Sequence, residues 1–480
     1  MTNFSDSAPG GRKKMGGCMH EGSTRGRSSF VQLLNPLRGH PPGVAILAVT
    51  EVWERMSYYG MRALLVFYMT KHLAFTQSQS SMIYGLYTAA VWLAPLPGGA
   101  IADRYLGQHR SVLIGGSLMA LGHFLMAFES LFFVALGVIA LGNGLFKPNI
   151  STQVGDLYAP EDPRRDRGYS FYYFGVSCGT FIAPLVCGTV GELYGWHWGF
   201  GIAGVGMVAG LGTYQYGRRW LPPDRLGRAA ARVGGHRDAL GGEWRKILAL
   251  GAISLSASFF WTAYEQQGNT IALWADTFTN RRVAWGFVDF TIPATWFQSL
   301  NGLFIIILTP ILISVWRLQA GRNREPSSAN KLIIGGVIAG AAYLILVVAA
   351  VFEAQAGPVS WLWLIAYFFT ITVGELYLSP TCLSLFNQAA PVRLASTMVG
   401  VWYLSLFLGS YLAGALGSYW NDVPKPWFFA AMSGLSFLSA FALFVTTKFF
   451  SRALEASLAP FVLAEDPSAG KRAALATRVS

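Results

Sequence analysis

The feature that most constrains the fold of this chain is a series of long apolar segments. Six of them lie at 44–69, 80–102, 110–128, 131–156, 168–194 and 197–217. Six more follow at 247–268, 293–317, 331–352, 359–387, 395–418 and 427–448. A helix crosses a bilayer with about 20 mostly apolar residues, and it satisfies its own backbone hydrogen bonds there. The sequence therefore predicts an all-α polytopic membrane protein with twelve transmembrane helices.

The composition agrees with this interpretation. Of the 480 residues, 53% are hydrophobic and only 12% are charged, whereas soluble proteins carry about 25% charged residues. The formal net charge of +12 comes from basic residues that fall in the short segments between the apolar ones. This distribution is typical of the positive-inside pattern and argues against a nucleic-acid-binding surface. We expect a lipid bilayer around the chain and no nucleic acid as a partner.

The polar segments divide the chain into five parts. We expect a disordered cytoplasmic tail at 1–40, which is rich in Gly, Ser and Arg and lacks the apolar core of a cleavable signal peptide. Two six-helix bundles at 41–217 and 247–449 are joined by a cytoplasmic linker at 218–246, and a second cytoplasmic tail spans 450–480. Most of the loop arginines fall on the side of the N-terminal tail. Both termini are therefore predicted to be cytoplasmic, in a cell (inner) membrane.

The first apolar segment carries four charged side chains, which are costly to hold in hydrocarbon and are normally kept there for function. Together with two tyrosines they recur every third or fourth position and so share one helical face: Glu51, Glu54, Arg55, Tyr58, Tyr59 and Arg62. A helix with one charged face is expected to border a hydrated cavity. The alternative is a buried ion-pair network that only holds helices together.

This segment, EVWERMSYYGMR, resembles the ExxER…YYG signature of the proton-dependent oligopeptide transporter family, a branch of the major facilitator superfamily. The arrangement of six spans, a linker and six more spans resembles the two-halved fold of that superfamily. The segment GGAIADRYLGQHR at 98–110 resembles the superfamily loop motif GGxxADRxxGxxR. In that motif Asp103 is suited to cap a helix end or pair with an arginine, and the resemblance implies a cytoplasmic gate that includes Asp103 and Arg104.

Further segments resemble the same family. Lys147 follows Gly142–Phe146 in the fourth span, where a family lysine lines the cavity; a lysine neutralised in place or paired structurally is the alternative. The fifth span is similar to FYxxINxG, but Ser177 stands where the family has asparagine, which leaves one contact to the substrate backbone open. The seventh span matches FWxxxEQ, so Glu265 is implied to pair with Arg62; an exposed glutamate is the alternative.

The remaining matches lie in the second half. Asn301 belongs to a QSxNP-like segment in which Gly302 replaces proline, and it is either a substrate amide or a helix-packing amide. Glu375, alone in a long apolar run, is implied to bind the amino terminus of a peptide and to be able to pair with Lys147; a purely structural role is the alternative. Trp402 matches MGxWF and either walls a side-chain pocket or packs against lipid.

The resemblance implies a proton-coupled symporter that imports di- and tripeptides by alternating access, and that works as a monomer without a cofactor. We expect proton coupling from Glu51, Glu54, Arg55 and Glu265. We expect substrate binding from Arg55, Tyr58, Tyr59, Arg62, Lys147, Ser177, Asn301, Glu375 and Trp402. We expect gating from Asp103, Arg104, Lys147, Glu375, Arg62 and Glu265.

Two other function classes are alternatives to this one. The first is a major facilitator carrier of another small substrate, such as nitrate or a drug-like anion, although the nitrate carriers of the family lack the complete ExxER motif. The second is an integral membrane enzyme, but the sequence has no HExxH motif and no clustered set of His and Asp residues. The cysteines show no CxxC spacing and the histidines are scattered, so no metal site is expected.

Overall fold

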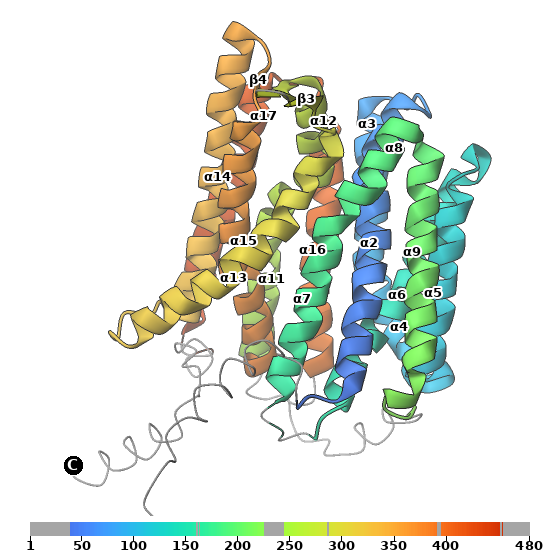
Figure 1. Ribbon diagram of the computed structural model, residues 1–480. Coiled ribbons are helices and arrows are strands. Elements are labelled where there is room, and N and C mark those ends of the chain that lie inside the picture. The colour runs from blue at the N-terminus through green and yellow to red at the C-terminus, as the bar shows by residue number, and fades with distance from the viewer. Residues whose placement is uncertain are drawn as a thin grey trace, which may run out of the picture. The chain divides into compact units, whose positions relative to one another are not determined.

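The computed structural model describes residues 39–159, 162, 164–224, 244–285, 288–390, 395–451 and 454, and these residues are mostly helical (Figure 1). The predicted tails at 1–40 and 450–480 and the centre of the predicted linker lie largely outside the described residues. The predicted helices are present with bounds that differ from the expected ones by only a few residues.

The first half of the described chain begins with a 30-residue helix. In chain order its elements are α2 Pro42–Lys71, α3 Gln77–Leu93, α4 Pro95–Ile101, the π-helix η1 Ala102–Leu106, α5 Gln108–Leu125, η2 Glu129–Leu131, α6 Phe132–Asp156, α7 Arg165–Ala183, η3 Pro184–Gly188, α8 Thr189–Tyr194, α9 Trp196–Gly217 and η4 Arg218–Trp220. Local sequence explains several boundaries. Thr76 and Gln79 form a capping box at the start of α3, and Gly107, with φ of +78°, separates η1 from α5.

The second half contains six further long helices and a few short strands. Its elements are α11 Trp244–Tyr264, η5 Glu265–Gly268, α12 Thr270–Thr277, β1 Thr279–Asn280, β2 Arg282–Trp285, β3 Val288–Thr291, η6 Ala294–Gln298, α13 Ser299–Ala320, α14 Ser328–Ala356, β4 Val359–Ser360, α15 Leu362–Ala389, α16 Ala395–Gly417 and α17 Lys425–Phe449. Strands β2 and β3 pair antiparallel, and β1 pairs in parallel with β4. Neither these strands nor the helix α12 was expected from the sequence, whose seventh span was predicted to end at 268.

Nine helical segments of the described chain are long and apolar enough to cross a membrane. Three more helices pack among them, α2, α5 and α9, with 30, 18 and 22 residues. The charged face of α2 sets this helix apart from the purely apolar segments. The chain is therefore a multi-pass helical membrane protein, and the count of twelve spans stays a prediction.

Each half has its own apolar core. One cluster of buried side chains runs from Leu47 to Leu221, and the other contains residues from Ala249 to Leu454 together with Val66 and Phe67 of α2. The halves meet along α3 and α16, where a Cβ on Gly85 would collide with the backbone of Gly414. Glycine at both positions allows this close helix contact. Helices α7 and α13 form a second contact between the halves, and α13 runs obliquely toward its Ala320 end (Figure 1).

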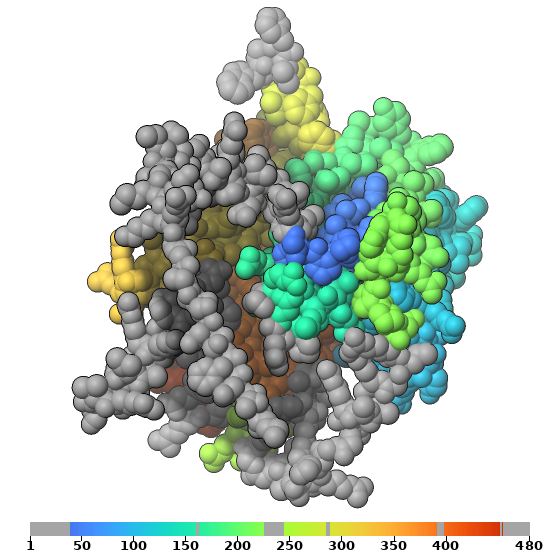
Figure 2. All heavy atoms as spheres, turned by 60° about the horizontal axis from the view of Figure 1, so that its bottom comes forward, coloured from blue at the N-terminus to red at the C-terminus, as the bar shows by residue number. Residues whose placement is uncertain are grey.

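We name the two ends of the helices by α2: the proximal end carries Pro42 and the distal end carries Lys71. Figure 2 looks onto the proximal end, where the first turn of α2 lies close to the last turn of α9. A Cβ on Gly43 would meet Trp220 and Leu157 there. The β2–β3 hairpin belongs to the distal end, and Arg282 pairs with Asp289 across it, with Nη2 2.5 Å from Oδ2. This hydrogen bond lowers the pKa of Asp289.

Candidate functional site

The charged face of α2 carries a compact ion-pair cluster. Arg55 Nε lies 3.0 Å from Glu51 Oε1, and it also contacts Glu54 Oε2. The three side chains are at most 4% exposed, although they are charged. Glu51 Oε2, both carboxylate oxygens of Glu54 and Arg55 Nη2 have no aligned hydrogen-bond partner in the described chain. The Arg55 guanidinium thus lies between two carboxylates. The unpartnered oxygens of Glu51 and Glu54 can still accept a proton, and Nη2 of Arg55 can still donate to a ligand.

Two tyrosines continue this face toward the distal end. Tyr58 is buried and Tyr59 is half-buried, and their rings meet edge to face with centroids 5.2 Å apart. The Arg55 guanidinium carbon lies 5.9 and 6.0 Å from the two ring centroids, and that of Arg62 lies 5.6 Å from the ring of Tyr59. The Tyr59 ring therefore contacts both guanidinium groups, whereas the Tyr58 ring contacts that of Arg55.

Arg62 connects the two halves of the chain. Its Nη2 donates to Glu265 Oε2 over 2.5 Å, and its Nε donates to Tyr84 Oη of α3 over 2.6 Å. Glu265 opens η5, where α11 ends, and it is only 2% exposed. The structure thus contains the ion pair between Arg62 and Glu265 that the family resemblance implied, and Glu265 is not an exposed glutamate.

Other polar contacts join the halves near this ion pair. Lys71 Nζ lies 2.6 Å from Asp276 Oδ2, and Asp276 also pairs with Arg281. Ser81 Oγ donates to Asn269 Oδ1 over 2.7 Å. Glu192 of α8 accepts hydrogen bonds from the backbone N–H groups of Ala294 and Thr295 at the start of η6. The distal ends of the two halves are therefore held together in this conformation.

Lys147 of α6 is half-buried, and its ammonium lies 3.7 Å from the centroid of the Trp92 ring. Trp92 in turn stacks on Tyr403 of α16, with ring centroids 6.1 Å apart. The cation is therefore stabilised by an aromatic ring at the contact between the halves. Lys147 makes no ion pair with any residue that the structure describes. The expected pair between Lys147 and Glu375 is therefore absent in this conformation.

Glu375 of α15 is instead held by an amide. Asn301 Nδ2 donates to Glu375 Oε2 over 2.9 Å and to Thr372 Oγ1 over 3.1 Å. Tyr264 Oη donates to Asn301 Oδ1 over 3.3 Å, which leaves the Asn301 amide with partners on both sides. Asn301 therefore orients the Glu375 carboxylate. The sequence suggested either a substrate amide or a helix-packing amide, and neither expectation included this contact with Glu375.

Two other candidate residues have local roles in this conformation. Ser177 Oγ donates to the carbonyl of Tyr173 in its own helix over 3.1 Å. Trp402 is 5% exposed and packs against Trp261 and Phe386 within the core of the second half. Packing against lipid was one of the two expectations for Trp402, and it is wrong because the ring is enclosed by these aromatic neighbours.

The loop motif between α4 and α5 lies at the proximal end. Asp103 and Arg104 are both exposed, and within the described chain Asp103 neither caps a helix nor pairs with an arginine. Asp224 caps α5 instead, because its Oδ1 accepts from the backbone N–H of His109 over 2.9 Å. His109 also contacts Tyr214 Oη and the Pro222 carbonyl, at 2.7 and 3.0 Å. These contacts fasten the first residues of the linker to the motif.

Several residues of this site were not predicted from the sequence, including Tyr84, Trp92, Tyr264 and Tyr403. Tyr84 and Trp92 are eight residues apart on α3 and thus share a helical face, which was the available signal. Tyr264 precedes Glu265 directly, and Tyr403 follows Trp402. A tyrosine in an apolar span is normally interpreted as a residue that packs in the core or against lipid, because the sequence does not show its hydrogen-bond partner.

The comparisons with known proteins agree on one family. The sequence profile of the POT family matches residues 109–232 and 233–432. The peptide transporter YePEPT of Yersinia enterocolitica is 34% identical over 459 residues, which cover 79% of this chain and 88% of that protein. A di-/tripeptide transporter of Lactococcus lactis subsp. cremoris is 34% identical over 435 residues, which cover 76% of this chain and 87% of that protein.

Solved structures give the same answer. A crystal structure of a mutant peptide transporter POT in complex with alafosfalin superposes with a TM-score of 0.78 at 30% identity, covering 87% of this chain and 96% of that one. A POT family transporter in complex with 5-aminolevulinic acid superposes with a TM-score of 0.77 at 25% identity, covering 86% and 98%. This chain therefore belongs to the POT family of membrane transporters with the major facilitator fold, and it is a transporter and not an enzyme.

Proposed function

We propose that this protein is a proton-coupled symporter that imports di- and tripeptides by alternating access. The names of the relatives support the substrate class, since two of the similar proteins are described as peptide and di-/tripeptide transporters. The further parts of the proposal concern orientation, substrate contacts and proton coupling, and they rest on the charges described above.

The proposed orientation follows from the loop charges. Arg104, Arg110 and Arg165 lie at the proximal end together with Arg218 and Arg219. The distal end carries Lys71, Arg281, Arg282 and Lys425, of which the first two share Asp276 and the third pairs with Asp289. The positive-inside rule then puts the proximal end in the cytoplasm. In this proposal the protein has twelve spans in an inner membrane, with 1–40, 218–246 and 450–480 cytoplasmic.

The observation that carries the substrate proposal is the sorting of charge between the halves. The first half supplies the cations Arg55, Arg62 and Lys147, with the carboxylates of Glu51 and Glu54 beside Arg55, whereas the second half supplies the anions Glu265 and Glu375. A peptide is a zwitterion, so its carboxylate is attracted to the first half and its ammonium group to the second. An arginine binds a carboxylate through two parallel hydrogen bonds, and Arg55 is suited to this contact.

Glu375 is the proposed partner of the peptide ammonium group. Its carboxylate is half-buried and already oriented by Asn301, so little reorganisation is needed to bind a cation. Tyr58 and Tyr59 would line the space toward Arg62, and Ser177 would reach the peptide backbone only after it leaves the Tyr173 carbonyl. Trp402 would act through Trp261, against which it packs, and not by direct contact.

Proton coupling is proposed for the carboxylates that share arginines. Glu51 and Glu54 both lie against Arg55, so protonation of one of them weakens its hold on the guanidinium and frees Arg55 for a peptide carboxylate. Protonation of Glu265 would break its pair with Arg62 and favour opening of the distal end. Proton and peptide thus bias the same equilibrium between two conformations.

Uptake into proteoliposomes tests this function. The purified protein is reconstituted, and accumulation of a labelled dipeptide is measured with and without an inward proton gradient. We expect accumulation that depends on the gradient and is competed by unlabelled di- and tripeptides, but not by single amino acids or tetrapeptides. Competition by nitrate or 5-aminolevulinate without competition by peptides would instead identify a carrier of another small substrate.

A further inference from the structure

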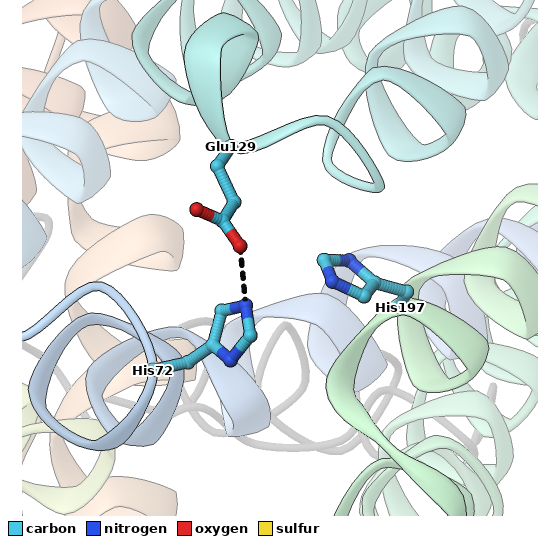
Figure 3. Close-up of side chains that lie close together, drawn as sticks. All are labelled: His72, Glu129 and His197. Carbon is cyan, nitrogen blue, oxygen red and sulfur yellow. Dashed lines mark hydrogen bonds and ion pairs between the residues drawn. The ribbon is translucent and has the colours of Figure 1, made fainter.

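Three side chains from distant parts of the sequence meet at the distal end of the first half. His72 follows the last residue of α2, Glu129 opens η2 before α6, and His197 lies in the first turn of α9. One ligand atom from each of them lies within 4.8 Å of the other two. Figure 3 shows the carboxylate and the two imidazole rings turned toward the same space.

The contacts among these groups are only partly satisfied. His72 Nε2 lies 2.8 Å from Glu129 Oε1, and the two imidazole rings meet edge to face with centroids 5.2 Å apart. His197 Nδ1 is buried and has no hydrogen-bond partner in the described chain. An ion pair between His72 and Glu129 explains the first contact, but it leaves the buried nitrogen of His197 unexplained. A shared ligand of all three groups would explain both features.

We propose that His72, Glu129 and His197 form a binding site for a divalent transition-metal ion of the Zn²⁺ type. Two imidazole nitrogens and one carboxylate oxygen are the three-ligand set of open zinc sites, with water at the remaining position. The same ligands favour Cu²⁺ and Ni²⁺, whereas Mg²⁺ and Ca²⁺ prefer sites made of oxygen alone. The transport function proposed above does not require this metal ion.

The geometry needs only small side-chain movements. Around a tetrahedral ion with bonds of about 2.0–2.1 Å, the ligand atoms lie about 3.4 Å apart. The outermost pair in this cluster, within 4.8 Å, must therefore close by at most about 1.4 Å, and the pair at 2.8 Å must open slightly. His72 and Glu129 are exposed, so they can make these rotations and an ion can reach them from solvent.

A neighbouring aromatic ring contacts the side chains of two of the ligands. The ring of Tyr68 stacks on His72 with centroids 5.1 Å apart and meets His197 edge to face at 6.0 Å. All three ligands belong to the first half, so binding would not have to break when the halves move relative to one another. If the proposed orientation holds, the site faces outside the cell. The histidines looked scattered in the sequence because 125 positions separate His72 from His197.

Metal binding to the purified full-length protein tests this site without any transport assay. The protein carries an affinity tag without histidine, is stripped with a chelator, and is titrated with Zn²⁺ in detergent by calorimetry. Co²⁺ is then used to read the coordination from its visible spectrum. The variants are His72→Gln, His197→Gln and Glu129→Gln, and the matched controls are His40→Gln and Glu353→Gln. Size-exclusion profile and thermal unfolding confirm that each variant is folded.

We expect one Zn²⁺ per chain in the wild type and in both controls, without competition by Mg²⁺ or Ca²⁺. Each histidine variant should raise the Kd for Zn²⁺ at least about tenfold, since even the loss of an outer-shell partner costs that much. Glu129→Gln should act in the same direction, and it keeps both rings in place if a histidine variant does not fold. Absence of Zn²⁺ binding in the wild type, or equal binding in all three variants, would overturn the site.

Discussion

At the scale of single residues, the most specific contact is the one between Asn301 and Glu375. If Glu375 binds the peptide ammonium group, Glu375→Gln removes the charged partner of a desolvated cation. We expect this to cost about 2 kcal/mol or more, which is roughly a 30-fold rise in Kd for a free dipeptide. Equilibrium binding, measured separately from transport, checks this, because Glu375 is also a candidate gating residue.

The control ligand for this prediction is the same dipeptide with an acetylated amino terminus. It lacks the ammonium group, so it should bind the wild type weakly and the variant equally weakly. Asn301→Ala keeps the charge of Glu375 but removes its orienting hydrogen bond, and it should weaken the free dipeptide less than Glu375→Gln does. Equal losses for free and acetylated peptides in Glu375→Gln would return Glu375 to a gating or packing role.

A second residue-scale prediction concerns the two carboxylates that share Arg55. Glu54→Gln or Glu51→Gln mimics a permanently protonated side chain, so uphill uptake driven by a proton gradient should be lost. Exchange of labelled for unlabelled dipeptide across the membrane needs no net proton movement, and it should persist at least in part. Loss of both activities together with a lower thermal unfolding temperature would favour the purely structural ion-pair network.

Residue patterns predicted the charged face of α2 well, because spacing every third or fourth position is a local property of a helix. The residues of the other half with which these charged side chains pair could not be predicted from spacing. The pair between Arg62 and Glu265 was expected only from the family resemblance, since 203 positions separate the two residues. Lys147 contacts the ring of Trp92 and does not pair with Glu375. This choice of partner depends on tertiary contacts, which the spacing of residues along the sequence does not reveal.

At the scale of elements, the closed distal end makes a prediction about movement. Ser81 of α3 and Asn269 before α12 belong to different halves, and their side chains are within hydrogen-bond distance. A double variant, Ser81→Cys with Asn269→Cys, should be joined by a short reversible thiol cross-linker. Because alternating access requires these ends to separate, the cross-link should abolish dipeptide uptake, and a reductant should restore it.

The background for this cross-link replaces Cys18, Cys178, Cys187 and Cys382 by serine. Each single cysteine variant, treated with the same reagent, serves as the control and should keep its uptake. Undiminished uptake in a fully cross-linked double variant would mean that the distal ends do not separate during transport.

The sequence predicted those helices whose position is decided by the length of an apolar segment. Segments of about 20 apolar residues lead to helices whatever their partners, so the bounds of α2, α6 and α14 were close to the expected ones. The strands β1–β4 and the short helix α12 were not expected. These strands are two to four residues long and gain their hydrogen bonds only from a partner strand, which no short apolar pattern reveals.

At the scale of the whole molecule, the proposed orientation can be checked by labelling. In the cysteine-free background, Ala230→Cys lies in the predicted cytoplasmic linker and Asn280→Cys lies exposed at the distal end. A membrane-impermeant thiol reagent should label position 280 in intact cells, and position 230 only after the membrane is permeabilised. Labelling of position 230 from outside would reverse the proposed topology.

The major facilitator fold could be predicted from the sequence, since the order of apolar segments and the loop motif at 98–110 are both local features, and the solved relatives confirm it. The binding partner of each charged residue, in contrast, depends on which ends of the two halves are closed. If the protein works by alternating access, as proposed, these partners change between its conformations. The half of the chain that carries each charged residue, in contrast, does not depend on conformation.

The central claim is that peptide and proton cross the membrane together. Proteoliposomes containing the protein and an internal pH-sensitive dye, with equal pH on both sides and an inside-negative potential, test it directly. We predict that external dipeptide acidifies the interior, that N-acetylated dipeptide at the same concentration does so far less, and that Glu54→Gln abolishes the acidification. Dipeptide entry at the wild-type rate without any acidification of the interior would contradict proton-coupled symport.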